Sequence, residues 1–498
     1  MTQLENTKIL ILTTFFLLAG SVAFGKNTKY HTVKFDINVF GCDLVKGDDG
    51  RYGWYELEDC HITHGQAPDG ELIPKKVIEI DKNGVFQLEA GHKGSTLTAD
   101  WWKSQLKLNQ IPDRWYPKML HFALRGKLTL NIRGDIFGTD NPIKLVIDDF
   151  YINHGKNEHY FNQIAIKSFK SYSTYSIEGR AVINGNDYRI YIEQKEKGTQ
   201  NNIYIGRIDK SKLSWMKRLD GNRPISTISM PGTHDSGSAN YPQDSISLFH
   251  DGHTQNFPVL TQLEDGIRAF DIRLRHDLRY GHYIKLYDSF DSTMVQWDKF
   301  LDKYPSEFIV ALIGSDEGGK WGKELTDNYR RLISQYPHRF VEKFSQSTPI
   351  DSVRGKIIVM RRQKGCPYGR LITFADNATF EYDGFHVEDI YRPKNAEKKL
   401  EAVEKNISEA SENKNPNRWF ITFNSIICAP NGHTPYNNAW GGTAKDIKTP
   451  MNKCLLEVLE QKKYSDFGIV FLDFYNDRGE NPNLMEAIIQ SNFQRKNE

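Results

Sequence analysis

The sequence has few cysteines, almost no net charge and a negative mean hydropathy. Its 65 Lys and Arg residues are nearly balanced by 63 Asp and Glu residues, which leaves a formal net charge of +2. This balance, without a long basic run, gives no indication of a nucleic-acid-binding protein. The hydropathy argues against a polytopic membrane protein. At 498 residues the chain is too long for one compact core and should hold two or three domains.

Five cysteines are compatible with an oxidising compartment but do not form a disulfide framework. Cys42 and Cys60 could pair within the amino-terminal region. Cys366, Cys428 and Cys454 allow at most one further pair. The alternative is that all five are buried thiols.

The amino terminus has the pattern of an export signal. Lys8 precedes the apolar stretch ILILTTFFLLAGSVAFG, and Ala23 and Gly25 occupy the −3 and −1 positions of a cleavage site before Lys26. This pattern predicts that residues 1–25 are a secretory signal peptide and that the mature chain is secreted or periplasmic. No cysteine stands at the site, so a lipoprotein anchor is not expected. An uncleaved anchor helix is the alternative, although the segment is short for a full span.

Residues 26–208 consist of short segments that alternate apolar and polar residues. HTVKFDINVF, KLTLNIRG and YRIYIEQ follow this period of two, and the turn signals KGDDG, DKNG and NGND lie between such segments. The pattern predicts an all-β domain of the sandwich type. We find no constellation of catalytic groups in it, and its role is open.

Two groups of side chains in this β-rich region have a functional and a structural interpretation. His61 and His64 are three residues apart and could bind a metal or lie on an ordinary surface. Trp101, Trp102 and Trp115 could form a binding face or pack in the core.

The pattern changes around residues 208–222. The following short apolar runs are PISTISM, IRAFDIRL, FIVALIG, KIIVMRR, WFITFNSII and FGIVFLDFY, and helix-like stretches such as TMVQWDKFLDKY separate several of them. Buried strands that alternate with amphipathic helices are typical of parallel βα units. With GFHVEDIY and LRYGHYIKL added, seven or eight strands fit between Pro224 and Tyr475. We therefore predict an α/β barrel of a distorted TIM type over residues 209–498, with a doubly wound sheet as the alternative.

Polar side chains end these apolar runs, at the strand ends where barrels collect their catalytic groups. They are His234, Asp235, Asp271, Arg273, His282, Arg361, Arg362, Glu388, Asp389, Tyr391, Asp473 and Tyr475. Each alone could be a cap, a surface charge or a partner for a backbone amide. Together, two histidines, carboxylates and an arginine suit phosphoryl transfer. One imidazole would take a proton, the other would return one, and a guanidinium would stabilise the phosphoryl charge.

Two segments in register carry a resemblance to a known family. WMKRLDGNRPISTISMPGTHDSGS and TQNFPVLTQLEDGIRAFDIRLR resemble the X-domain of bacterial phosphatidylinositol-specific phospholipase C. The similarity continues through FLDKYPSEFIVALI, RGKIIVMRR, FITFNS and GIVFLDFY. It covers roughly Ser211 to the carboxyl terminus and leaves the β-rich region unexplained.

The resemblance implies a role for each of two histidine–aspartate pairs. His234 is implied to deprotonate the inositol 2-hydroxyl while Asp473 orients it. His282 is implied to protonate the diacylglycerol oxygen, with Asp235 as its partner. Because the nucleophile belongs to the substrate, the product would be a cyclic inositol phosphate, formed in a lyase-type cleavage. The expected partner is phosphatidylinositol or a related inositol lipid at a membrane surface.

The resemblance also implies an arginine in place of a metal. Arg273 is implied to contact the phosphoryl group with support from Asp271. In calcium-dependent relatives an acidic residue stands at this position, and a guanidinium there would repel Ca²⁺. We therefore expect a metal-independent enzyme without a cofactor. Arg362, Asp389 and Tyr391 match positions that contact inositol in relatives.

The sequence departs from the family pattern at two places. The second histidine is usually followed by glycine, whereas here the order is GHY, and the interval from Arg273 to His282 is short. His276 therefore remains the alternative general acid. After FIVAL this chain has IGSD, where the family often offers a basic head-group contact. The inositol lipid could accordingly be plain, glycosylated or linked to ceramide.

Two other functions are alternatives. A metal-dependent barrel like glycerophosphodiester phosphodiesterases or sphingomyelinase D needs acidic ligands near the first histidine, and Arg273 argues against it. A non-catalytic lipid- or glycan-binding protein would not need both proton carriers, so the presence of both His234 and His282 argues against that function.

Overall fold

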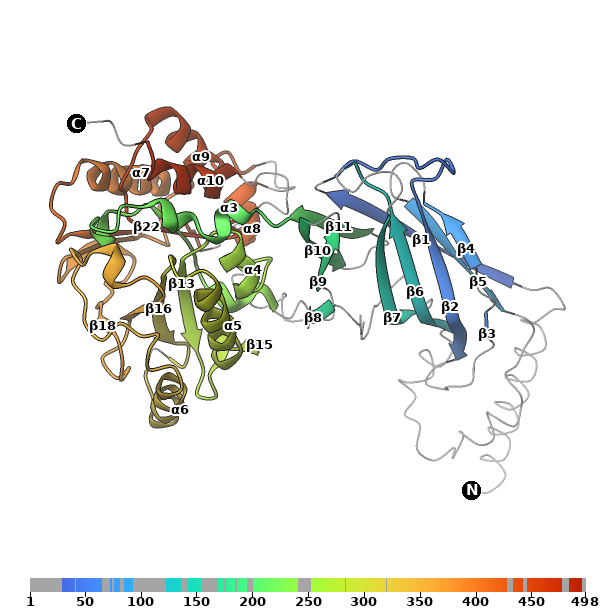
Figure 1. The fold of residues 1–498 in the computed structure, drawn as a ribbon, viewed down its shortest axis with the longest axis horizontal. Coiled ribbons are helices and arrows are strands. Elements are labelled where there is room, and N and C mark those ends of the chain that lie inside the picture. Colours follow the sequence, from blue (N-terminus) through green and yellow to red (C-terminus); the bar gives the residue numbers. More distant parts are fainter. Residues whose placement is uncertain are drawn as a thin grey trace, which may run out of the picture. The chain divides into compact units, whose positions relative to one another are not determined.

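The computed structural model divides the chain into two compact units, Met1–Gly206 and Arg207–Glu498 (Figure 1). The structure describes residues 29–40, 42–64, 72–73, 76–80, 85–92, 122–135, 142–153, 169–173, 176–183, 186–194, 200–240, 252–282, 284–318, 320–427, 433–441, 446–476 and 483–494. The predicted signal peptide, the three tryptophans at 101, 102 and 115, and Cys428 lie outside these ranges.

The described elements of the amino-terminal unit are strands. They are β1 (Lys29–Phe40), β2 (Gly53–His64), β3 (Leu72–Ile73), β4 (Lys76–Glu79), β5 (Val85–His92), β6 (Phe122–Ile132), β7 (Ile143–Asn153), β8 (Phe169–Ser173), β9 (Ser176–Ile183), β10 (Asn186–Gln194) and β11 (Gln200–Arg207). One sheet has the order β5-β1-β11-β10-β9-β8, and the other has the order β3-β2-β6-β7 with β4 also on β2. The period-two segments thus lie in strands, while their arrangement as a sandwich stays a prediction.

Three of the described cysteines are not in disulfide bonds. Cys42, Cys366 and Cys454 are free thiols. A Cys42–Cys60 bridge is therefore not formed, and neither is any bridge from Cys366 or Cys454. Burial raises the pKa of the Cys366 thiol to about 12, as expected for an unreactive buried side chain.

The parallel strands of the carboxyl-terminal unit follow one another around a single sheet. They are β12 (Met230–Thr233), β13 (Ala269–Leu274), β16 (Ile309–Ser315), β17 (Ile357–Arg361), β20 (Phe385–Asp389), β21 (Trp419–Phe423) and β22 (Ile469–Leu472). The sheet order is β18-β17-β16-β13-β12-β22-β21-β20-β19, with β18 (Arg370–Leu371) and β19 (Ala378–Tyr382) at its ends. The first and last parallel strands, β12 and β22, are paired. This pairing is typical of a barrel and not of a doubly wound layer.

The prediction that LRYGHYIKL forms a strand of the barrel is wrong. LRYGHYIKL forms a hairpin instead, in which β14 (Arg279–His282) runs antiparallel to both β13 and β15 (Ile284–Ser289). The hairpin lies off the path of the main sheet. Its apolar residues gave no indication of strand direction, because period-two alternation is the same in parallel and antiparallel pairs.

Helices separate most of the parallel strands, as the βα pattern predicts. They are α3 (Lys210–Leu213), α4 (Val259–Glu264), α5 (Phe290–Lys303), α6 (Lys323–Ser334), α7 (Ala396–Glu412), α8 (Pro435–Trp440), α9 (Met451–Lys462) and α10 (Asn483–Ser491). In α5 the buried residues Phe290, Met294, Trp297 and Leu301 recur every three or four positions, which gives the helix one apolar face. Within the described residues no helix is long and apolar enough to span a membrane.

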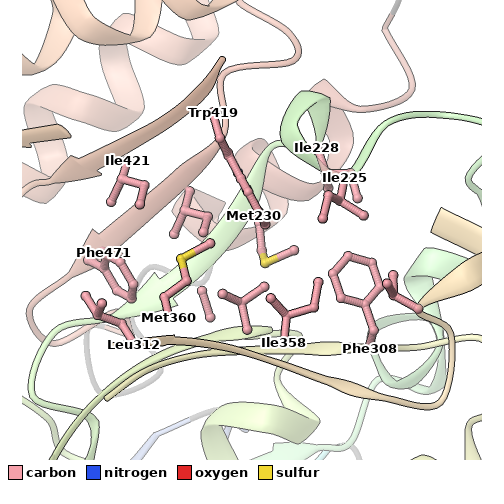
Figure 2. Packing of buried hydrophobic residues seen from close by; sticks show 14 of the residues in the cluster. Ile225, Ile228, Met230, Phe308, Leu312, Ile358, Met360, Trp419, Ile421 and Phe471 are labelled. Carbon is pink, nitrogen blue, oxygen red and sulfur yellow. The ribbon is translucent and has the colours of Figure 1, made fainter. Parts of the chain in front are cut away.

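Alternate residues of the parallel strands form the apolar interior of this unit. Figure 2 shows Met230, Leu312, Met360, Ile421 and Phe471 converging from different strands, and all are almost fully buried. Because side chains two residues apart lie on the same face of a strand, the next inward position on several strands is polar. These next positions are Asp271 and Arg273 after Ala269, Arg362 after Met360, Asp389 after Val387, and Asp473 after Phe471. The apolar core therefore lies directly beneath a polar layer.

Candidate active site

His234 and Asp473 come from the paired strands β12 and β22. Thr233 is in register with Leu472, and the backbone N–H of His234 donates to the Leu472 carbonyl at 3.0 Å. The two side chains that follow are hydrogen-bonded, with His234 Nδ1 2.7 Å from Asp473 Oδ1. Both are largely buried. The strand pairing thus brings the imidazole and its carboxylate together over 239 residues of sequence.

Arg273 decides which nitrogen of His234 carries the proton. Its Nη2 lies 2.7 Å from His234 Nε2. A guanidinium can only donate, so Nε2 accepts this bond while Nδ1–H donates to Asp473. In this arrangement the imidazole is neutral and its lone pair is on Nε2, which is the state that a general base requires.

Opposing effects act on the pKa of His234. Burial lowers the pKa, whereas the charge and the hydrogen bond of Asp473 raise it, and the positive charge of Arg273 again lowers it. The net result is a pKa above the ordinary value for histidine. Asp473 therefore contributes basicity as well as orientation.

His282 and Asp235 form a second pair. His282 ends β14 and is buried, and its Nδ1 contacts the carboxylate of Asp235. Asp235 has a left-handed backbone conformation with φ of 47°, which aspartate tolerates better than most residues. This turn directs the adjacent side chains of His234 and Asp235 to different partners. Each aspartate thus serves a different histidine.

Arg273 lies among the carboxylates. Its Nε is 3.0 Å from Asp235 Oδ1, and its Nη2 is 3.1 Å from Asp271 Oδ2. Arg362 Nη2 contacts the other oxygen of Asp271 at 3.2 Å. Burial alone would raise the pKa of Asp271, but Arg362 and Arg273 hold it well below the usual range. Asp271 is thus a buried anion that fixes two guanidinium groups.

Two aromatic rings support Arg362. Its guanidinium carbon lies 4.1 Å from the centre of the Phe374 ring and 5.4 Å from that of Phe423. Stacking on these faces limits the rotation of a long side chain and favours its charge. Its Nε is buried and has no hydrogen-bond partner among the described residues.

Asp389 and Tyr391 lie at the end of β20 but differ in their surroundings. Burial raises the pKa of the Asp389 carboxyl, although the charges of Arg362 and Lys399 oppose the shift. The hydroxyl of Tyr391 donates to Asp376 at 2.5 Å. The structure thus brings Asp389 close to the charges of the site, whereas Tyr391 bonds to a loop beside it.

The structure separates the two candidate acids. His276 bonds to Glu317 Oε1 at 2.7 Å, and 45% of its side chain is exposed. His282 is 8% exposed and contacts Asp235. Only His282 of these two therefore lies with the histidine–aspartate set.

Three other polar residues at strand ends have structural partners. Arg361 donates to carbonyl groups of its own loop. Glu388 forms a fully buried pair with Lys399 at 2.8 Å. The hydroxyl of Tyr475 donates to Asp265 at 2.7 Å.

Two buried amides that the sequence analysis did not single out bind the backbone of the site. Gln255 Nε2 lies 2.8 Å from both the His234 and the Leu472 carbonyl oxygens. Asn452 Nδ2 lies 2.8 Å from the Asp473 carbonyl oxygen. Neutral amides carry no chemical signature; Gln255 lies in the segment TQNFPVLTQLEDG, which resembles the family, whereas Asn452 had no sequence signal of its own.

No metal centre is evident in the part of the chain that the structure describes. Within those residues, no group of three or more His, Cys, Asp or Glu side chains could hold a metal ion. The carboxylates of Asp235 and Asp271 instead contact the guanidinium of Arg273.

The geometry defines a class of site. Two histidine–aspartate pairs flank an arginine above the apolar interior of the sheet, with His282 supplied by the antiparallel strand β14 and the other four side chains lying at the carboxyl ends of parallel strands. Such a set can remove one proton, deliver another and stabilise negative charge between them.

Comparison with known proteins identifies relatives with a named activity. No protein-family model matches the chain. Over 261 residues it is 28% identical to the 1-phosphatidylinositol phosphodiesterases of two Staphylococcus aureus strains, a match that covers 47% of this chain and 80% and 76% of theirs. A solved double mutant of the phosphatidylinositol-specific phospholipase C from S. aureus shares the fold with a TM-score of 0.50 and 23% identity, over 57% of this chain and 98% of the other. Over about half of its length, the chain is therefore homologous to bacterial phosphatidylinositol-specific phospholipases C.

Proposed function

We propose that the protein is a phosphatidylinositol phosphodiesterase of the phospholipase C type. The homologous S. aureus proteins are named as enzymes of this activity. The observation that carries the proposal is the pair of contacts His234–Asp473 and His282–Asp235 on either side of Arg273. A protein that only bound lipid would have no use for two oriented imidazoles.

The first half of the reaction is removal of a proton. Nε2 of His234 takes the proton from the inositol 2-hydroxyl, and the freed oxygen attacks the neighbouring phosphorus to form the cyclic ester. Asp473 keeps Nδ1 protonated and stabilises the imidazolium that results. Arg273 leaves Nε2 and bonds to the phosphoryl oxygens, because their growing negative charge attracts it more strongly than a neutral imidazole does.

The second half is departure of diacylglycerol. The bond from phosphorus to the glycerol oxygen breaks, and His282 delivers a proton to that oxygen. The contact of Asp235 with Nδ1 of His282 holds the imidazole in place for this step. The products are diacylglycerol and a cyclic inositol phosphate. Inositol binding falls to Arg362, Asp389 and Tyr391.

In this proposal the guanidinium of Arg273, and not a metal ion, stabilises the negative charge on the phosphoryl oxygens. Arg273 contacts Asp235 and Asp271, so the anionic groups nearest the phosphate already have a positive partner. A divalent cation would have to displace that side chain before it could bind the same carboxylates. We therefore expect activity without any added metal ion.

The proposed setting is a membrane surface outside the cytoplasm. The signal-like segment of residues 1–25 supports secretion or export to the periplasm. The substrate is an inositol lipid in a bilayer, and the enzyme acts as a peripheral protein. The amino-terminal unit is proposed to be a domain of the sandwich type, its role stays open, and none of its described residues is among those assigned to the site.

A comparison of histidine variants tests this function. Wild type, His234→Ala and the exposed control His276→Ala are assayed with EDTA on phosphatidylinositol, a glycosylated inositol lipid and inositol phosphoceramide. Loss of the base should reduce cleavage by roughly 10²–10⁴-fold on each lipid that wild type cleaves, while His276→Ala stays active. If His234→Ala left every measurable function unchanged, a binding protein would explain the data better.

A further inference from the structure

A buried loop segment reaches both strand ends that carry the base and its carboxylate. Thr254 and Gln255 precede α4, and their side chains are 1% and 0% exposed. Loops normally run over the surface, because buried polar backbone is costly unless it is bonded. Here the polar groups of the segment bond to β12 and β22 at the points where His234 and Asp473 follow them.

Gln255 joins the two strand ends through one nitrogen. Its Nε2 donates to the carbonyl oxygens of His234 and Leu472, each at 2.8 Å. The first carbonyl is that of the base itself, directly after β12, and the second ends β22, directly before Asp473. A single amide group thus fixes the distance between the two backbones that carry the pair.

Thr254 bonds to the same two strand ends with its side chain and its backbone. Its hydroxyl donates to the His234 carbonyl at 3.0 Å, and its carbonyl accepts the Phe474 N–H at 2.6 Å. Phe474 follows Asp473 and has a φ of 43°, which is rare and strained for a bulky residue. The Phe474 carbonyl is held in turn by Trp440 Nε1 at 2.7 Å. Such a backbone persists only where its surroundings enforce it.

We infer that Thr254 and Gln255 are positioning residues that hold His234 and Asp473 at bonding distance. The inference rests on the proposed function. Neither side chain needs to touch the substrate. Each acts by keeping the ends of β12 and β22 together, so that Asp473 stays in contact with Nδ1 of His234 throughout the reaction.

Two nearly isosteric variants test the inference in the full-length chain. Gln255→Met keeps the volume and removes both bonds, and Thr254→Val removes only the hydroxyl. We expect kcat to fall by up to about 10²-fold with KM unchanged, because misplacement of a catalytic group by about 1 Å has that effect. If Gln255→Met does not fold, Thr254→Val still tests the inference.

The pH profile separates positioning from general support of the fold. The charged groups that face His234 are Asp473, Asp235, Arg273, Asp271 and Asp389. Asp473 contributes most to the raised pKa of His234, so a loosened contact should move the acid limb of kcat/KM to lower pH. A variant that only lost stability would have the same acid limb of kcat/KM as the wild type.

Asn492→Leu is the matched control. Asn492 is also a buried amide, and its Nδ2 donates to the Ser229 carbonyl at 2.8 Å, immediately before the other end of β12. It should lower stability without moving the acid limb. The inference is overturned if the Gln255 and Thr254 variants keep the wild-type limb and kcat, or if Asn492→Leu shifts the limb equally. Absence of cyclic inositol phosphate with wild type would instead overturn the proposed function.

Discussion

Arg273 links the protonation states of the site, because one guanidinium contacts His234, Asp235 and Asp271. Burial would weaken each ion by itself, but the mutual contacts keep Asp235 and Asp271 ionised and raise the pKa of Arg273. The same guanidinium lowers the pKa of His234, which Asp473 raises. The bonds to Arg273 and Asp473 place the lone pair of His234 on Nε2, and the basicity of the imidazole depends on the buried carboxylate of Asp473.

The fall of kcat/KM at acidic pH should depend on the carboxylate of Asp473. A general base must be deprotonated, and the pKa of His234 is raised, so the acid limb of kcat/KM should have its midpoint above about 6.5. Asp473→Asn removes the main charge that raises the pKa, so the midpoint should move to lower pH while kcat falls by roughly 10²–10⁴-fold. A midpoint that stays in place in this variant would mean that another group limits the acid limb.

His282 can be tested as the acid by changing the leaving group. His282→Ala should reduce cleavage of the lipid by roughly 10²–10⁴-fold, because the glycerol oxygen leaves poorly without a proton. With an inositol phosphate ester of an acidic phenol the loss should be much smaller, since that oxygen departs as an anion. His276→Ala should lose little on either substrate. Equal losses on both esters with His282→Ala would argue against its role as the acid.

At the scale of elements, strand pairing and turns deliver the site. The β12–β22 ladder brings the ends of two distant strands side by side, and the alternation along each strand turns apolar residues into the barrel below the polar ones. The hairpin β14–β15 supplies His282 from outside the main sheet. The site is therefore an assembly of strand ends that the Thr254–Gln255 segment and the buried amide of Asn452 join by hydrogen bonds.

The carboxyl end of α9 allows a test of the backbone conformation assigned to Lys463. Lys463 caps α9 in the left-handed conformation with φ of 51°, and its side chain is exposed. Lys463→Gly should raise the free energy of unfolding by about 0.5–1 kcal/mol, because glycine adopts this conformation without strain. Denaturant unfolding measures the effect. The control Glu460→Gly, within the same helix, should lower the free energy by about 1 kcal/mol. A loss of stability in both variants would contradict the assigned conformation.

The sequence predicted the strand ends better than their connections. Asp271, Arg273 and Asp473 follow buried apolar runs, so their common edge could be inferred from alternation and the barrel rule alone. The choice between His276 and His282 could not be made, because it depends on the register of a hairpin that period-two patterning does not fix. Gln255 was overlooked because its role depends on bonds between distant strands, which no local pattern encodes.

At the scale of the whole molecule, every residue assigned to the site belongs to the unit Arg207–Glu498. That unit has its own apolar interior, drawn from its strands and from the 3₁₀ turn that precedes β12. The described strands of Met1–Gly206 contribute no side chain to the chemistry. Among the described residues, all side chains assigned to the site thus come from the second of the two units.

Removal of the first unit should therefore leave the chemistry intact. A chain of residues 207–498 should fold cooperatively and cleave a short-chain, monomeric phosphatidylinositol with the kcat/KM of the full chain. Kinetics on the soluble substrate and thermal unfolding measure this. If the shortened chain is folded but inactive on the monomeric lipid, then the amino-terminal unit takes part in the reaction.

The central claim is cleavage by two imidazoles and a guanidinium, with the substrate's own hydroxyl as the nucleophile. Phosphorus NMR of the products from phosphatidylinositol, with purified full-length protein in EDTA, tests it most directly. The account predicts that the resonance of a five-membered cyclic inositol phosphate appears first and at the rate of lipid loss. No cleavage in EDTA, cleavage only after Ca²⁺ is restored, or an acyclic phosphate as the first product would contradict it.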